Sequence, residues 1–139
     1  MDHNTAMIEW LLTCPQVSRL YALWGSAADG TMHYLRLNDS INRAYLDGGL
    51  DQTLDCTILC YHRFQRDWDT GQEAHENLLS YQEAQAICDW VKEQDKRQHF
   101  PDIPGVYAVE PRPANPQIAG ADENGLAKYI VGVRVWYGS

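Results

Sequence analysis

The chain has 139 residues, of which 45% are hydrophobic and 22% charged, and its 11 basic and 19 acidic residues give a net charge of −8. This length predicts one domain, residues 1–139, with enough chain to bury a core without disulfides or metals. No apolar run approaches the ~18 residues of a membrane span, and the N-terminal segment lacks the basic residues of a secretory signal. The excess of acidic residues disfavours a nucleic-acid-binding protein, because such proteins use basic residues to neutralise phosphates. We therefore expect no membrane and no sequence-specific nucleic acid among its partners.

Residues 1–16 are expected to form an N-terminal helix, because their apolar residues follow helical spacing and Pro15 ends the pattern. Asn4 or Thr5 is expected to cap the free amides at its start. A strand is predicted over 32–37, after a turn near residues 29–30.

A β-hairpin follows. A short strand over 43–46 leads into Asp47-Gly48-Gly49, where glycine supplies the positive φ that a tight turn needs. The second strand, over 54–61, alternates apolar residues onto one face. Those residues are Leu54, Cys56, Ile58 and Cys60.

The strongest helix prediction begins at Ser80. The pattern Ser80-x-x-Glu83 is a capping box, in which the two side chains satisfy free backbone N–H groups, and helically spaced apolar residues continue to about Lys96. Eight acidic residues and one basic residue, Lys92, lie between 67 and 95. We interpret this acidic stretch as a solvated helix face. The alternative is a surface that keeps DNA from sticking inside a channel.

The C-terminal third is predicted to hold a short strand over 106–110 and a long one over 126–137. The long strand has apolar residues on both faces, which indicates a central position. Between the two strands, residues 110–125 contain three prolines and two glycines and are predicted to form an extended arm without internal structure. The resulting order, α-β-β-β-α-β-β, predicts an α+β fold with a mainly antiparallel sheet.

The aromatic residues and the arm favour a binding role. Thirteen of the fifteen aromatic residues are Trp or Tyr, the types that suit surfaces with one apolar and one wet side. The predicted partner contacts are Pro111, Pro113 and Pro116 of the arm and Trp136 of the last strand. The alternatives are an arm that lies passively on its own domain and aromatic residues that line the edge of its own core.

The sequence predicts no catalytic residue, no cofactor site and no metal site. It lacks a glycine-rich phosphate loop and a nucleophile-elbow motif. The four cysteines are interpreted as small buried hydrophobic residues, because Cys56 and Cys60 lie about 13 Å apart along one strand, too far for a disulfide. One alternative is a small cytosolic hydrolase that uses His62 and the nearby carboxylates for acid–base chemistry. Those neighbours include Asp67, Asp69 and Glu76, with His75 between them.

From Ile41 to the end of the chain, several short pieces occur in one characteristic order. They are Arg43-Ala44-Tyr45-Leu46-Asp47-Gly48-Gly49, Asp89-Trp90-Val91, Phe100-Pro101-Asp102-Ile103-Pro104-Gly105, Pro116-Gln117-Ile118-Ala119-Gly120-Ala121-Asp122-Glu123 and Lys128-Tyr129-Ile130-Val131. In this order the chain resembles the tail terminators of long-tailed bacteriophages, often labelled minor capsid proteins.

The resemblance implies a sheet backed by helices on one face and assembly into a homohexameric ring. Such a ring caps the tail tube, ends its polymerisation and joins the tail to the head. The implied partners are copies of the chain itself, the major tail tube protein and a head-completion or neck protein. The implied location is the head–tail junction of the virion, after assembly in the bacterial cytoplasm, and no catalysis is implied. There are two alternatives to a tail terminator. One is another small phage neck or tail completion protein, and the other is a host-side binding domain.

Overall fold

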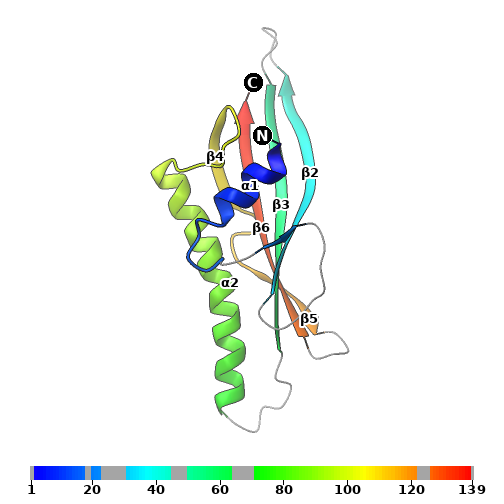
Figure 1. Ribbon diagram of the computed structural model, residues 1–139, viewed down its shortest axis with the longest axis vertical. Coiled ribbons are helices and arrows are strands. Elements are labelled where there is room, and N and C mark those ends of the chain that lie inside the picture. Colours follow the sequence, from blue (N-terminus) through cyan, green and yellow to red (C-terminus); the bar gives the residue numbers. More distant parts are fainter. Residues whose placement is uncertain are drawn as a thin grey trace.

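The computed structural model describes residues 2–17, 20–22, 31–44, 50–63, 71–121 and 126–138, which form two helices and a single sheet (Figure 1). The elements in chain order are α1 (His3–Leu11), β1 (Tyr21–Ala22), β2 (Met32–Ala44), β3 (Leu50–Arg63), α2 (Gly71–Arg97), β4 (Val106–Pro111), β5 (Gln117–Ala121) and β6 (Leu126–Gly138).

The described strands are arranged in the order β1-β2-β3-β6-β4, and β5 also pairs with β6. Every pair is antiparallel except β1 with β2. The last strand is central, as predicted: β3 runs along one of its sides, while β4 and β5 divide the other side between residues 133–137 and 127–130. These pairings confirm the α+β class with a mainly antiparallel sheet.

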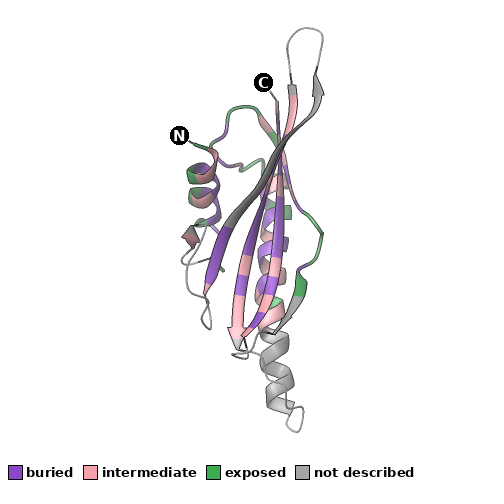
Figure 2. Cartoon of the chain, turned by 90° about the vertical axis from the view of Figure 1, so that its right-hand side faces the viewer, coloured by how far each residue is buried: buried purple, intermediate pink, exposed green. Residues whose placement is uncertain are grey.

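Both helices pack on the same face of the sheet, which we call the helix face. The ring of His3 in α1 lies 5.3 Å from that of Tyr137, and the ring of Tyr81 in α2 lies 6.4 Å from that of Tyr129. Tyr129 and Tyr137 are an even number of residues apart in β6, so both side chains point to the same face. The opposite face, which neither helix covers, is called the outer face below (Figure 2).

The core lies between the helices and the helix face. The predicted alternation in β3 is confirmed, because Leu54, Cys56, Ile58 and Cys60 are all at most 1% exposed. Alternate residues of β6 are buried in the same way. The helix residues that meet them include Met7, Trp10 and Leu11 of α1 and Ala84, Ile87, Cys88 and Val91 of α2. All four cysteines are buried with free thiols, and burial raises the pKa of Cys60 to about 12 and of Cys88 to about 11.

The predicted helix starts are both wrong. The N-cap of α1 is Asp2, whose carboxylate accepts hydrogen bonds from the backbone N–H and the hydroxyl of Thr5, while Asn4 accepts one from the hydroxyl of Tyr34. Ser80 lies inside α2, which begins nine residues earlier at Gly71. A Ser-x-x-Glu pattern within a continuous helix has no free N–H groups to cap, because the preceding turn already supplies their acceptors.

The strand predictions also need correction. The predicted strands over 32–37 and 43–46 belong to one strand, β2, which extends to Ala44 and follows β3 through two register shifts. The turn at 45–49 lies outside the described residues. The arm over 110–125 is not free of structure, because its first residues finish β4 and residues 117–121 form β5.

The acidic stretch divides between two environments where the structure describes it. Asp89 and Glu93 of α2 are exposed, in agreement with a solvated helix face. Asp95 instead accepts a hydrogen bond from the backbone N–H of Val109 in β4 at 3.0 Å. This contact satisfies a free group on an edge strand, which protects that edge from pairing with another chain. Asp67 and Asp69 lie outside the described residues.

Candidate interaction site on the outer face

Charged and aromatic side chains from three strands meet on the outer face. The pairing of β3 with β6 sets Asp55 opposite Arg134, and the pairing of β4 with β6 sets Glu110 opposite the same arginine. Trp136 lies two residues beyond Arg134, so it points to the same face. The sheet register thereby collects four side chains that are distant in the sequence.

Asp55 and Arg134 form a bidentate ion pair. The Nε and Nη2 atoms of Arg134 donate to the two carboxylate oxygens at 2.7 and 3.0 Å, and each side chain is 25% exposed. The hydrogen bond to Asp55 raises the pKa of Arg134 above its ordinary value. Two parallel hydrogen bonds between a guanidinium and a carboxylate hold both side chains in one orientation. Arg134 is therefore a fixed element of the outer face.

The network continues from Arg134 toward the edge of the sheet. The guanidinium carbon of Arg134 lies 5.7 Å from the centre of the Trp136 ring, within cation–π range. The indole Nε1–H of Trp136 donates to Glu110 Oε1 at 3.2 Å, and Arg112 Nη1 donates to the same oxygen at 3.1 Å. Trp136 is thus held by a cation on one side and a carboxylate on the other.

The segment that follows β4 crosses this face directly above Gly132. The backbone N–H of Arg112 donates to the Gly132 carbonyl at 2.8 Å. A Cβ atom at position 132 would lie 2.2 Å from the Arg112 carbonyl oxygen, so only glycine allows the two backbones to approach this closely. We call residues 112–116 the outer loop. It is anchored at both ends, by β4 and by β5.

A cavity of about 200 Å³ lies beneath the outer loop. Thr57, which is 6% exposed, contributes to its lining. Burial raises the pKa of the Cys56 thiol, which therefore stays protonated and is a poor nucleophile. The cavity suits a small polar group or the tip of a side chain. Its lining comprises Asp55, Cys56, Thr57, Arg112, Pro113, Gln117, Ile130, Gly132, Val133 and Arg134.

The structure brings together two of the four predicted contact residues. Trp136 is half-buried in the outer-face network, and Pro113 is exposed in the outer loop and lines the cavity. Pro111 and Pro116 are buried, so they anchor the outer loop to its own domain and do not reach outward. The prediction of an extended arm is wrong for them, because strand pairing with β6 fixes both ends of the segment.

The ion-paired residues of this site do not stand out as a pattern in the sequence. Asp55 and Glu110 lie 79 and 24 residues from Arg134, and only the sheet register brings all three together. One signal was present in the sequence: two charged residues, Lys128 and Arg134, share one face of a largely apolar central strand with Trp136. A charged side chain on a central strand is partly removed from water, so it requires an oppositely charged or hydrogen-bonding partner.

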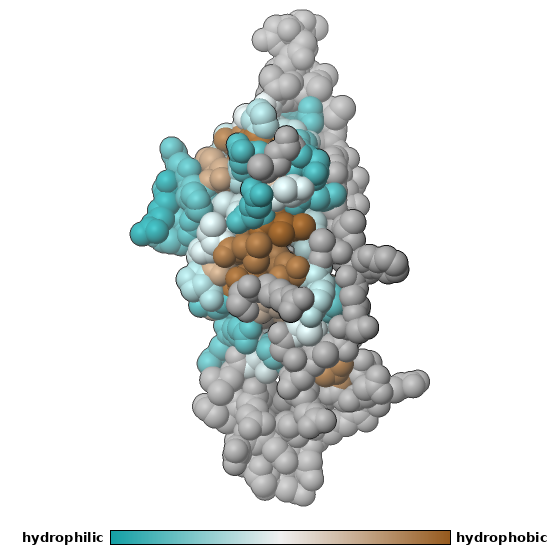
Figure 3. Space-filling view, viewed as in Figure 1, coloured by the Kyte–Doolittle hydropathy of each residue, from teal (hydrophilic) through white to brown (hydrophobic). Residues whose placement is uncertain are grey.

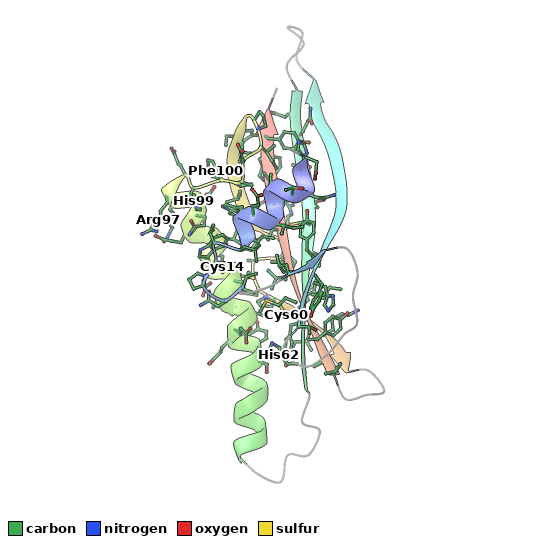
Figure 4. All side chains as sticks on the ribbon, in the orientation of Figure 1. Cys14, Cys60, His62, Arg97, His99 and Phe100 are labelled. Atoms are coloured by element: carbon green, nitrogen blue, oxygen red, sulfur yellow. The ribbon has the colours of Figure 1, made fainter. Side chains whose placement is uncertain are left out.

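The alternative site around His62 lies on the other side of the sheet, next to α2 (Figure 4). His62 Nε2 is 3.7 Å from Glu83 Oε2, is buried, and has no hydrogen-bond partner among the described residues. Its ring contacts that of Tyr129 edge-on. The side chains of His75 and Glu76 are not described, so Glu83 is the carboxylate that the structure places beside His62.

Within the described residues, no group of three or more His, Cys, Asp or Glu side chains is placed to hold a metal ion. Among the same residues, no helix has the length and apolar character needed to cross a bilayer. When compared with known proteins, the chain matches no protein-family model and no curated protein.

Proposed function

We propose that the protein is a structural protein of the phage head–tail junction, which forms a ring, caps the tail tube and joins it to the head. The observation that carries the proposal is the construction of the outer face. Ion pairs fix an aromatic side chain and a projecting loop on a face that neither helix covers. Rigid side chains on an uncovered face suit contact with another protein, because little conformational freedom is lost on docking.

The order of motifs from Ile41 to the C-terminus supports the choice of a phage tail terminator among assembly proteins. The partners that follow are further copies of the chain, the major tail tube protein and a head-completion or neck protein. The proposed location of the protein is the virion. The cavity chemistry agrees with a binding role, since the described polar groups beneath the outer loop include two paired arginines and no histidine.

A tube-assembly experiment tests this function. The purified protein is added to the polymerising major tail tube protein of the same phage, and tubes are viewed by negative-stain electron microscopy. We expect shorter tubes with a ring of density at one end. Unchanged tube lengths with bare ends would refute the capping function.

A pair of variants assigns the effect to the outer face. Trp136→Ala removes the aromatic group of the network and should weaken capping. Tyr81→Ala removes a half-buried aromatic group from the helix face and should leave capping unchanged once the protein is folded. Equal capping by the two variants would show that the outer face is not used.

A further inference from the structure

An open groove of about 480 Å³ lies on the helix-bearing side of the molecule, between the turn after α1 and the last turns of α2. Figure 4 places Arg97 and His99 at the end of α2 on this side. The apolar wall is the indole of Trp90, which is itself packed 4.8 Å from the ring of Trp10. The groove is lined by Thr13, Pro15, Trp90, Glu93, Gln94, Arg97 and His99.

Two side chains of the groove lining, Gln94 and Trp90, carry hydrogen-bond donors. Gln94 is 5% exposed, and its Oε1 accepts a hydrogen bond from Nδ1 of His99 at 2.6 Å, which fixes the orientation of its amide group. The second is Trp90, whose indole carries one N–H donor and lines the same groove. An amide and an indole N–H that line an open groove suit a ligand that supplies carbonyl oxygens.

The same side of the molecule also exposes apolar side chains. Leu12, directly after α1, is 44% exposed although it is a large hydrophobic residue. Figure 3 shows a hydrophobic patch in the middle of the same side of the molecule. Apolar walls with a few polar groups are typical of sites that bind a short stretch of polypeptide.

The outer loop offers the complementary chemistry. Residues 112–115 are all exposed, and Figure 2 shows them in green on the side of the molecule away from α1. Neither Ala114 nor Asn115 forms a backbone or side-chain hydrogen bond within the described residues, so their carbonyl oxygens are free acceptors. Pro113 adds an exposed apolar ring of the kind that packs on tryptophan.

The charges of the two surfaces can exchange partners. Arg112 pairs with Glu110 at 3.1 Å beside the outer loop, and Arg97 pairs with Glu93 at 3.4 Å beside the groove. All four side chains are more than 40% exposed, and such pairs contribute little to the stability of one chain. Contact between the surfaces would allow Arg112 to pair with Glu93 and Arg97 with Glu110.

We infer that the outer loop of one copy docks into the groove between α1 and α2 of the next copy. This inference rests on the proposed ring and names the contact that builds it. The two surfaces differ and lie on opposite sides of the chain, so the contact is head-to-tail. Head-to-tail contacts repeat from copy to copy and close into a ring when the rotation between copies permits it.

A charge-exchange experiment tests the contact. Arg112→Glu and Glu93→Arg each place like charges at the docked surface and should weaken assembly by at least about tenfold. The double variant restores an opposite pair and should assemble within about threefold of the natural protein. Lys92→Glu, an exposed change on α2 outside the groove lining, is the matched control and should assemble normally. Association is measured by sedimentation velocity, and circular dichroism confirms that each variant is folded.

The outcomes separate this contact from the proposed function. Rings from the natural protein together with normal assembly of both single variants would overturn the contact and leave the proposed function standing. A double variant as weak as the single variants would overturn it as well. Failure of the natural protein to form rings at any concentration would instead overturn the ring itself.

Discussion

The two faces of the sheet are held in different ways. On the helix face, Leu54, Ile58 and Val131 have no exposed surface and are covered by apolar residues of α1 and α2. On the outer face, the corresponding alternate residues include Asp55, Arg134 and Trp136, which are partly exposed and fixed by hydrogen bonds. Apolar burial supplies most of the free energy of folding, whereas paired charges mainly set orientation. The helix face therefore maintains the fold, and the outer face is available for recognition.

The largest expected difference is between matched isoleucines on the two faces. Ile58→Ala opens a cavity between β3 and the helices and should lower the free energy of unfolding by about 2–5 kcal/mol. Ile130→Ala removes the same atoms from the half-buried outer face and should cost about half as much or less. Urea denaturation of both variants measures the two losses. Equal losses would mean that the outer face is packed as tightly as the core.

A second substitution tests how closely the outer loop lies on the sheet. Gly132→Ala places a methyl group against the Arg112 carbonyl oxygen, so the loop must move, and we expect a loss of about 1–3 kcal/mol. Thermal unfolding measures the loss. The control is Ala127→Gly, which removes a methyl group from a buried position of the same strand. An unchanged melting temperature for Gly132→Ala would show that the loop is held loosely.

A third substitution tests the ion pair that fixes the outer face. Asp55→Asn removes the charge but keeps the shape, and we expect a loss of about 1–2 kcal/mol because the guanidinium of Arg134 loses its charged acceptor. The loss should fall in high salt, since both side chains are partly exposed. A variant that is as stable as the natural protein would assign the pair no stabilising role.

The smallest expected effect concerns the start of α1, far from the outer face. Hydrogen bonds from the backbone and side chain of Thr5 lower the pKa of Asp2 below 3.8. A carboxylate with a lowered pKa in the folded state stabilises the fold above pH 3.8, and this contribution disappears as the pH falls through the lowered value. Asp2→Asn retains a capping oxygen without the charge. Its stability should therefore lack this part of the pH dependence when denaturation is compared at pH 2 and pH 6, and identical profiles would contradict the assignment.

Local patterns in the sequence were sufficient to predict part of the fold. Alternation in 54–61 predicted both the strand and the face that it buries. Apolar residues on both faces of 126–137 predicted a central strand, which the sheet order confirms. The start of α2 could not be found in the same way. Ser80 and Glu83 have capping spacing, yet packing of the whole helix against the sheet places them within it.

Features that depend on pairing between distant segments were not predictable. β5 is only five residues long, follows two prolines and is defined by its partner β6, so its sequence is typical of a loop. Asp55 and Arg134 are 79 residues apart and meet only through the register of β3 with β6. Trp136 was predicted as a contact residue, and the side chains that hold it, Arg134 and Glu110, could be identified only from the fold.

Amide hydrogen exchange at two protein concentrations tests the central claim most directly, that the outer face is the surface used in assembly. Exchange is measured by mass spectrometry below and above the concentration at which the chain associates. We predict that association slows exchange in residues 112–118 and in the last turns of α2, while the buried strands β3 and β6 exchange slowly at both concentrations. Association without any added protection in residues 112–118 would contradict the account.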